Sequence, residues 1–449
     1  MKALARRPNG EYSLPMKKHT KLVLVIAFIA IAPVWAEQWE SLPSDPYFIA
    51  FKPLRAPRTD TLLLKPGDRL AICGDSITEQ KMYSRIMEAY LTVCAPQLDI
   101  TVRQFGWSGE RAPGFLARMK NDTLRFKPTI ATTCYAMNDH RYQPYRDDFG
   151  REYRDASRSI IRLFKEHGVR VIQGSAGTVG RMPSWVKQAR GTVNDLNLSL
   201  LEFRNIDVRL ARSEQVAFAD VFLPMLVGGF EAKQRYGADY MVSGKDGVHP
   251  GWAGQLIMAY AFLKAMGLEG EIGTIKMDWT KDGATASKGH RVLSARKHEV
   301  QVESSRYPFC ATGPVDNDGS IRSGMTLVPF NQDLNRFILI VRNARAGRYR
   351  VTWGESTQSY SAAQLAQGVN LAADFQTNPF SAPFARVDEA VAKKQAYETR
   401  QIKTLFHGPE GRADMEATAA LTEKVRRPLA AAIKAAFAPV RHTIRVEAQ

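Results

Sequence analysis

Short apolar runs alternate with amphipathic stretches between Leu70 and Leu268. The runs have the length of strands, and the stretches between them repeat apolar residues at helical spacing. Alternation of this kind predicts an α/β fold, in which a parallel sheet carries helices on both faces. The expected strands are Leu70–Cys73, Ile100–Phe105, Thr129–Tyr135, Val169–Gln173 and Val216–Val221, and the expected helices include Asp155–His167, Asp195–Arg212 and Gly254–Met266.

The pattern changes after Gly270, where short alternating runs with turn signals predict a small β-rich module. Its expected strands are Arg291–Val302, Met325–Phe330, Arg336–Arg342 and Tyr349–Trp353. A helix over Asp388–Leu405 is expected to pack back on the α/β domain, and an Ala-rich helix over Ala413–Phe437 is expected to be interrupted at Pro428. The predicted division is 1–36, 37–64 (an N-terminal extension), 65–270 (the α/β domain), 271–380 (the β-rich module) and 381–449 (a helical segment).

The first residues have the pattern of a secretory signal. Lys21 and two nearby lysines precede an uninterrupted apolar run over 22–32, and small residues stand where a signal peptidase reads, which predicts cleavage after Ala36. Either Met1 or Met16 fits as the start of that signal. The apolar run is too short for a stable membrane anchor. We therefore expect a secreted or periplasmic protein.

The net charge is +17, and residues 1–36 contribute six basic residues and Glu11, so about +12 would remain after cleavage. A basic surface suits an anionic partner such as an acidic polysaccharide or a membrane surface. No dense Lys/Arg run interleaved with aromatic residues is present, so nucleic acid is not an expected partner. A solvated basic surface without any partner fits the composition equally well.

Four cysteines in 449 residues do not make a disulfide scaffold. Cys73 and Cys134 lie in strand-like runs and are expected to be buried thiols, although a bridge between them stays open in an oxidising compartment. No Cys or His pair has the spacing of metal ligands, and we expect neither a metal nor another cofactor.

The stretch from Leu70 to Gln80 contains the first candidate for chemistry. Ser76 stands where a buried strand ends and a helix begins, next to unpaired N–H groups and the positive end of a helix dipole. A hydroxyl there can act as a nucleophile, and negative charge that develops there is stabilised. Ser76 and Glu79 also have the spacing of a capping box, so a purely structural cap is the competing interpretation.

Three further segments follow later strands or precede a helix. Gly109 follows the second strand, where a backbone N–H can approach an oxyanion closely, and Asn138 follows the third, where its amide can donate to the same oxyanion. In Asp246-Gly-Val-His249, the carboxylate can fold back onto the imidazole and leave Nε2 free to take a proton from Ser76. His140 lies on the same rim and is the rival base.

Gly74-Asp-Ser76, Gly109, Asn138 and Asp246-x-x-His249, in this order and spacing, resemble the GDSL/SGNH hydrolases over roughly residues 65–268. The resemblance implies a flavodoxin-like three-layer α/β/α sandwich. It further implies that Ser76 is the nucleophile, that His249 is the base oriented by Asp246, and that Ser76, Gly109 and Asn138 form the oxyanion hole. Ala136 departs from the family pattern, which usually has glycine there, and its methyl group could shift the Asn138 loop.

These features together predict a secreted serine esterase that acts through an acyl-enzyme. The export signal, basic charge and appended β module favour removal of acetyl groups from a carbohydrate, with an anionic polysaccharide or its oligomers as one candidate. Trp107 and Trp252 could stack on a sugar ring, although core packing suits both equally. The other candidate substrate-binding residues are Asp75, Arg111 and Asp139. A lipase or arylesterase, or a glycan-binding protein with a vestigial esterase site, are the alternatives.

Overall fold

A five-stranded parallel sheet, in the order β2-β1-β3-β4-β5, is the framework for the residues singled out above. The computed structural model describes residues 37–345 and 347–449, so the predicted signal lies outside the described residues. Every position of β3 is buried, and so is every position of the other four strands except the first, as a sheet covered on both faces requires. The strands are β1 Arg69–Gly74, β2 Thr101–Gly106, β3 Ile130–Cys134, β4 Arg170–Gly174 and β5 Ala217–Ala219.

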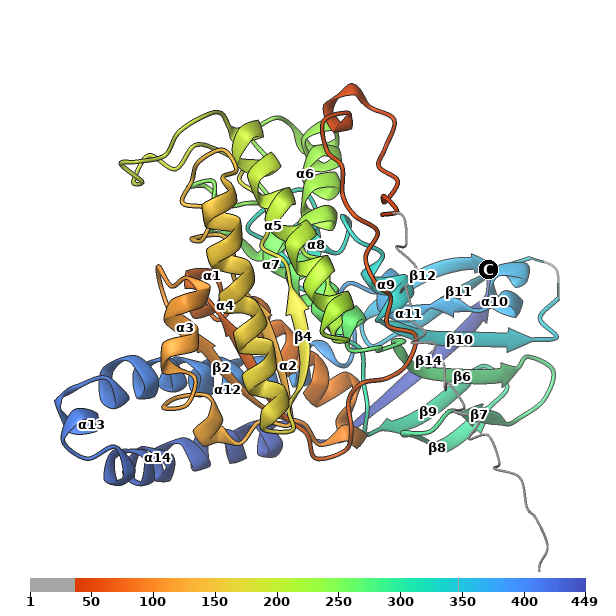
Figure 1. Cartoon of the computed structure of the whole chain (residues 1–449). Helices are drawn as coiled ribbons and strands as arrows, with labels where there is room; N and C mark the ends of the chain where they lie inside the picture. Colours follow the sequence, from red (N-terminus) through yellow and green to blue (C-terminus); the bar gives the residue numbers. More distant parts are fainter. Residues whose placement is uncertain (1–36, 346) are drawn as a thin grey trace, which may run out of the picture. The chain divides into compact units, whose positions relative to one another are not determined.

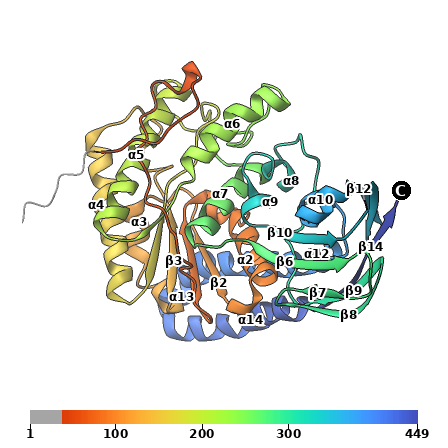
Figure 2. The same ribbon diagram turned by 90° about the vertical axis from the view of Figure 1, so that its right-hand side faces the viewer.

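Helices cover both faces of this sheet, with α3, α4 and α5 on one side and α2 and α7 on the other (Figure 2). This arrangement confirms the predicted α/β fold. The helices of this part are α1 Ser76–Glu79, α2 Tyr83–Cys94, α3 Ala112–Arg118, α4 Asp147–Glu166, α5 Val193–Ser213, α6 Phe222–Tyr236 and α7 Trp252–Ala265.

The strand register separates Cys73 from Cys134. Cys73 pairs with Thr133, and Cys134 pairs with Gly74, so the two thiols point to opposite faces of the sheet. Both are buried and free, as are the other two cysteines. The bridge left open by the sequence is therefore absent.

Residues after Gly270 build two further sheets, with the orders β13-β10-β6-β7 and β12-β11-β14-β9-β8. They confirm the expected β-rich region, and β10 follows the predicted strand over Arg336–Arg342. Short helices α8 Ile321–Gly324, α9 Phe330–Asp333, α10 Ala362–Gln367 and α11 Leu371–Asp374 connect the strands. The strands are β6 Glu271–Asp278, β7 Ala284–Ala286, β8 His290–Arg296, β9 Glu299–Ser304, β10 Arg336–Arg342, β11 Arg348–Trp353, β12 Ser356–Ser361, β13 Val369–Asn370 and β14 Val440–Ala448.

Two strand predictions in this region are wrong. Met325–Phe330 is not a strand, because Pro329 cannot donate to a ladder and the flanking residues form α8 and α9 instead. Arg291–Val302 is not one strand but parts of the antiparallel pair β8 and β9, which turns at Lys297 and His298.

The C-terminal segment begins with α12 Ser381–Arg400, continues through a π-helical turn, Gln401–Phe406, and α13 Pro409–Ala413, and reaches α14 Met415–Ala436. The expected interruption at Pro428 is wrong, because α14 runs through it. Buried side chains on one face, including Arg426 and Ile433, hold the helix there. The expectation of helix throughout 381–449 also fails at its end, where β14 inserts between β11 and β9.

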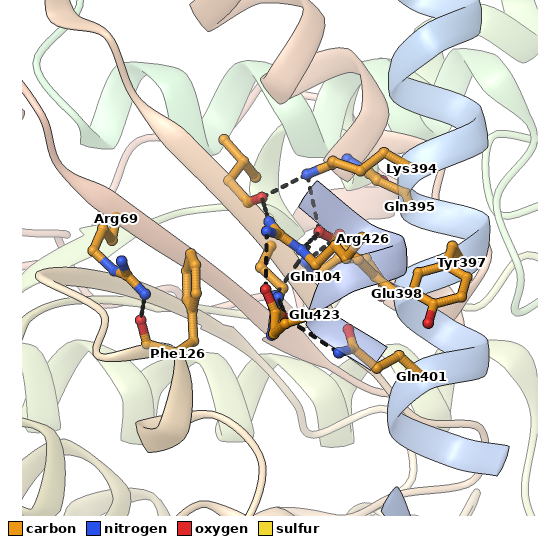
Figure 3. A network of polar contacts seen from close by, with 12 residues as sticks. Arg69, Gln104, Phe126, Lys394, Gln395, Tyr397, Glu398, Gln401, Glu423 and Arg426 are labelled. Atoms are coloured by element: carbon orange, nitrogen blue, oxygen red, sulfur yellow. Dashed lines mark hydrogen bonds and ion pairs between the residues drawn. The ribbon is translucent and has the colours of Figure 1, made fainter. Parts of the chain in front are cut away.

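Helix α12 packs against α2 and the edge strand β2, as the sequence predicted (Figure 1). An edge strand presents unpaired backbone groups that need partners. Lys394 donates to the Val102 carbonyl at 2.5 Å, and Glu398 accepts from the Gln104 N–H at 3.4 Å (Figure 3). Side chains of α12 therefore supply hydrogen bonds to β2 that a neighbouring strand would otherwise make. Residues Gln38–Gln449 consequently form one compact unit.

Candidate active site

Ser76 is the first residue of α1, directly after β1. The cap of this helix is Asp75, whose side chain accepts the Ile77 N–H at 2.9 Å. Glu79, the other half of the supposed capping box, instead accepts the Ser108 N–H at 2.5 Å. The Ser76 hydroxyl is therefore not used as a helix cap, and the capping-box interpretation is wrong.

His249 lies beside Ser76 although 173 positions separate them in the chain. The Ser76 Oγ and His249 Nε2 atoms are 2.8 Å apart, and His249 Nδ1 is 2.6 Å from Asp246 Oδ2. The other carboxylate oxygen, Asp246 Oδ1, accepts the N–H groups of Val248 and His249, both at 2.9 Å. Burial alone would raise the pKa of Asp246, but these hydrogen bonds hold it below its ordinary value, so the carboxylate is charged.

Gly109 and Asn138 follow β2 and β3, at the same edge of the sheet as Ser76. Gly109 has φ +73°, a left-handed conformation that favours glycine. The Asn138 amide is oriented at both ends, because Nδ2 donates to the Glu110 carbonyl at 3.1 Å and Oδ1 accepts from the Tyr142 hydroxyl at 3.2 Å. One N–H of the Asn138 amide remains for a substrate oxyanion.

Asp139 joins the two loops that carry these donors. Its Oδ1 accepts the Ala112 N–H at the start of α3, and its Oδ2 accepts the Ala136 N–H, both at 3.0 Å. Burial raises the pKa of Asp139 to about 7 against these hydrogen bonds. Because the Asp139 carboxyl is buried and bonded to both loops, its geometry suits holding the loops in place and does not suit contact with a substrate. Ala136, the departure from the family pattern, has φ +84°, which glycine would adopt without strain.

His140, the rival base, is completely buried. Burial lowers the pKa of His140 to about 3, so its imidazole is neutral over the working pH range. The hydrogen bond from Ser76 goes to His249 instead.

Three of the candidate substrate-binding side chains contact other parts of the protein. The half-buried Trp107 ring lies 4.9 Å from the His407 ring and under the Arg118 guanidinium, and the half-buried Trp252 ring lies under Arg85. Arg111 pairs with Glu152 at 3.1 Å. These contacts favour the packing interpretation for both tryptophans.

Trp185 is an exposed aromatic residue that the sequence reasoning missed. Its side chain is 50% exposed, and its ring centroid lies 5.8 Å from that of His249 and 5.6 Å from that of Tyr142. It belongs to the loop between β4 and α5, at the carboxyl edge of the sheet where ligands bind in α/β folds. Its place in the sequence after the fourth predicted strand was the feature from which a position near the site could have been predicted.

Within the described ranges 37–345 and 347–449, no group of three or more His, Cys, Asp or Glu side chains could hold a metal ion. In the same ranges, none of the helices is both long enough and apolar enough to cross a membrane.

The chain is similar over 87% of its length to all of BT4096, a gut microbial diltiazem-metabolizing enzyme, with 20% identity and a TM-score of 0.71. Axe2, an acetylxylan esterase from Geobacillus stearothermophilus, matches 46% of this chain with 98% of its own, at 21% identity and a TM-score of 0.39. A search of curated proteins found no relative.

The likeness to BT4096 shows the shared fold, including the region beyond the parallel sheet. Residues 72–257 match the sequence profile of the GDSL-like Lipase/Acylhydrolase family, and this range contains Ser76, Asp246 and His249. The chain therefore carries a hydrolase domain of the GDSL-like lipase/acylhydrolase family, a group of carboxylic ester hydrolases.

Proposed function

We propose that the chain is a serine esterase that works through an acyl-enzyme, with Ser76 as nucleophile, His249 as base and Asp246 as its orienting group. The observation that carries the proposal is the continuous hydrogen-bonded line from Ser76 Oγ to His249 Nε2 at 2.8 Å and from His249 Nδ1 to Asp246 Oδ2 at 2.6 Å. This line is the arrangement that a serine needs for activation.

In the first half-reaction, Ser76 Oγ forms a bond to the ester carbonyl carbon while its proton moves to His249 Nε2. The carbonyl oxygen becomes an oxyanion, which the N–H groups of Ser76 and Gly109 and the Asn138 amide stabilise. The bond to the leaving alcohol then breaks, and His249 donates the proton to that alcohol. Asp246, held ionised, stabilises the imidazolium between these two proton transfers.

In the second half-reaction, a water molecule gives its proton to His249 Nε2 and attacks the acyl carbon. The bond to Ser76 Oγ breaks, the proton returns to Ser76, and the acid leaves. Two easier steps thus replace one difficult displacement.

For the natural substrate, we propose an acetylated carbohydrate, with an anionic glycan as the preferred form. The sugar alcohol leaves from the His249 side, where Trp185 offers an exposed ring of the kind that stacks on sugars. Arg181, Lys187 and Arg190 are exposed in the same loop, which carries no acidic residue between positions 181 and 190. The net charge of +17, of which about +12 would remain after cleavage at Ala36, favours the same class of substrate, and export to the cell exterior would give access to it.

The experiment is a chain-length series of 4-nitrophenyl esters, from acetyl to palmitoyl, run beside acetylated acidic and neutral oligosaccharides at low and high salt. We expect acetyl to be preferred and acidic glycans to gain an advantage that salt removes, because the Debye length falls to about 8 Å at physiological strength. Preference for long acyl chains would instead identify a lipase, and hydrolysis of aryl esters alone would identify an arylesterase.

Trp185→Ala tests the sugar platform against Trp39→Ala, a matched control at another exposed tryptophan. The first variant should raise KM for acetylated oligosaccharides several-fold and leave 4-nitrophenyl acetate nearly unaffected, while the control changes neither. Equal KM values in both variants would remove Trp185 from the substrate site. Glycan binding without any hydrolysis would support the alternative of a vestigial esterase site.

A further inference from the structure

The C-terminal segment reaches the loop that follows β2, where Gly109 lies. Helix α12 runs along β2 in the direction of the strand, from the contact of Lys394 with Val102 to the contacts of Lys403 with the loop. Nine helical residues rise about 14 Å and five strand residues about 17 Å, so the two elements advance together. The turn that follows α12, Gln401–Phe406, is π-helical, a geometry that is frequent at functional sites.

Lys403 makes the first contact from this turn. Its ammonium lies 2.9 and 2.8 Å from the two Glu79 carboxylate oxygens and 5.2 Å from the Trp107 ring centroid. The same Glu79 carboxylate accepts the Ser108 N–H at 2.5 Å. Burial alone would raise the pKa of Glu79, but Lys403 and Ser108 hold it below its ordinary value. A charged Glu79 thus ties the nucleophile helix α1 to the residue before Gly109.

His407 makes the second contact. Its ring lies edge-on to Trp107 at 4.9 Å, and its Nε2 lies 2.9 Å from Asp122 Oδ2. Asp122 is fully buried and also accepts from Arg118, which donates two 2.6 Å hydrogen bonds to Glu110.

This series of hydrogen bonds continues from Glu110 to Asn138, the side chain that is expected to donate to the oxyanion beside Gly109. The Glu110 carbonyl accepts from Asn138 Nδ2 at 3.1 Å. The sequence between Trp107 and Glu110 is therefore held from both sides, with Gly109 in the middle. Glycine at φ +73° has no side chain to fix it, so its N–H direction depends on these neighbours.

We infer that Lys403 and His407 are positioning residues of the esterase site, which hold the Trp107–Gly109 loop so that the Gly109 N–H points at the oxyanion. The C-terminal segment, whose Lys403 lies 324 positions after Glu79 in the chain, is on this inference part of the active site. The inference rests on the proposed esterase function, since it assigns a role to the oxyanion donors.

The test uses the full chain and the variants Lys403→Met, Lys403→Arg and His407→Gln. The matched control is Lys393→Met, which removes an exposed ion pair with Glu389 on the same segment. Removing one oxyanion donor costs roughly 100-fold to 1,000-fold in kcat, so a displaced donor should cost roughly 10-fold to 100-fold. We expect that loss for Lys403→Met with little change in KM, partial recovery in Lys403→Arg, a smaller loss in His407→Gln, and full activity in Lys393→Met.

A second readout is the rate of inactivation by diethyl 4-nitrophenyl phosphate, which reports on Ser76 and the oxyanion donors without an acyl substrate. It should fall in parallel with kcat, while thermal unfolding shows that the variants are folded. Full kcat and full inactivation rate in folded Lys403→Met and His407→Gln would overturn the inference. Ser76→Ala separates the two proposals, because activity that survives Ser76→Ala refutes the esterase function itself.

Discussion

Replacing Asp246 by Asn tests the orientation of His249 with almost no change in shape. In the native site Asp246 Oδ1 accepts two backbone N–H groups at 2.9 Å, and Oδ2 accepts from His249 Nδ1 at 2.6 Å. An Asn amide must keep its oxygen on the two N–H donors, so its NH₂ group faces Nδ1. That arrangement stabilises the imidazole tautomer with the proton on Nε2, which cannot accept the Ser76 proton.

The expected loss in kcat is about 10⁴-fold, or about 5 kcal/mol of transition-state stabilisation, because the tautomer is wrong and the imidazolium loses its partner. KM should change little, since Asp246 does not face the substrate in this account. The assay is steady-state hydrolysis of 4-nitrophenyl acetate by purified enzyme. Asp239→Asn, at an exposed aspartate in the same connection, is the matched control and should be fully active. An Asp246→Asn enzyme within tenfold of the native kcat would refute the reasoning.

Three further outcomes follow from buried residues near Ser76. The acid limb of the kcat/KM profile should vanish in His249→Ala and persist in His140→Ala, because burial lowers the pKa of His140 to about 3 and keeps it neutral; the reverse pattern would make His140 the base. Burial raises the pKa of Asp75 to about 7, so between about pH 4 and pH 7 the folded state binds a proton that the unfolded state has lost. The free energy of unfolding should therefore fall by up to about 4 kcal/mol as the pH rises through this range. Urea unfolding of Asp75→Asn should show a weaker dependence on pH, and an unchanged dependence would contradict the assignment. Ala136→Gly should raise the unfolding free energy by up to about 1 kcal/mol and Ala136→Val should lower it, because the φ of +84° strains any side chain; equal stability of all three would show that no strain exists.

The parallel sheet could be predicted because its strands are buried on both faces and read as short apolar runs between amphipathic helices. The pairing of Asp246 with His249 was also predictable, since the two residues are three positions apart in one turn. Strand β14 was missed although Val440–Ala448 alternates apolar and polar residues with His442 as the one interruption, because its place between β11 and β9 depends on segments far away in the chain.

The contacts around the Trp107–Gly109 loop could not be predicted for a related reason. Lys403 and Glu79 are 324 positions apart, and nothing in either local sequence indicates the partner. From the sequence, sugar stacking and core packing suit Trp107 equally, because its position against His407 depends on the path of α12 along β2. Trp185 carried a weak signal in its place after a strand, but its approach to His249 comes from the loop conformation.

The most direct test of the central claim is to trap the covalent intermediate. Native enzyme and Ser76→Ala would be mixed with 4-nitrophenyl acetate, quenched in acid within the first turnover, digested and analysed by mass spectrometry. We expect one acetyl group on the peptide that contains Ser76 in the native enzyme, and no acetylated peptide and no turnover in Ser76→Ala. An acetyl group on another residue, or turnover that persists without Ser76, would contradict it.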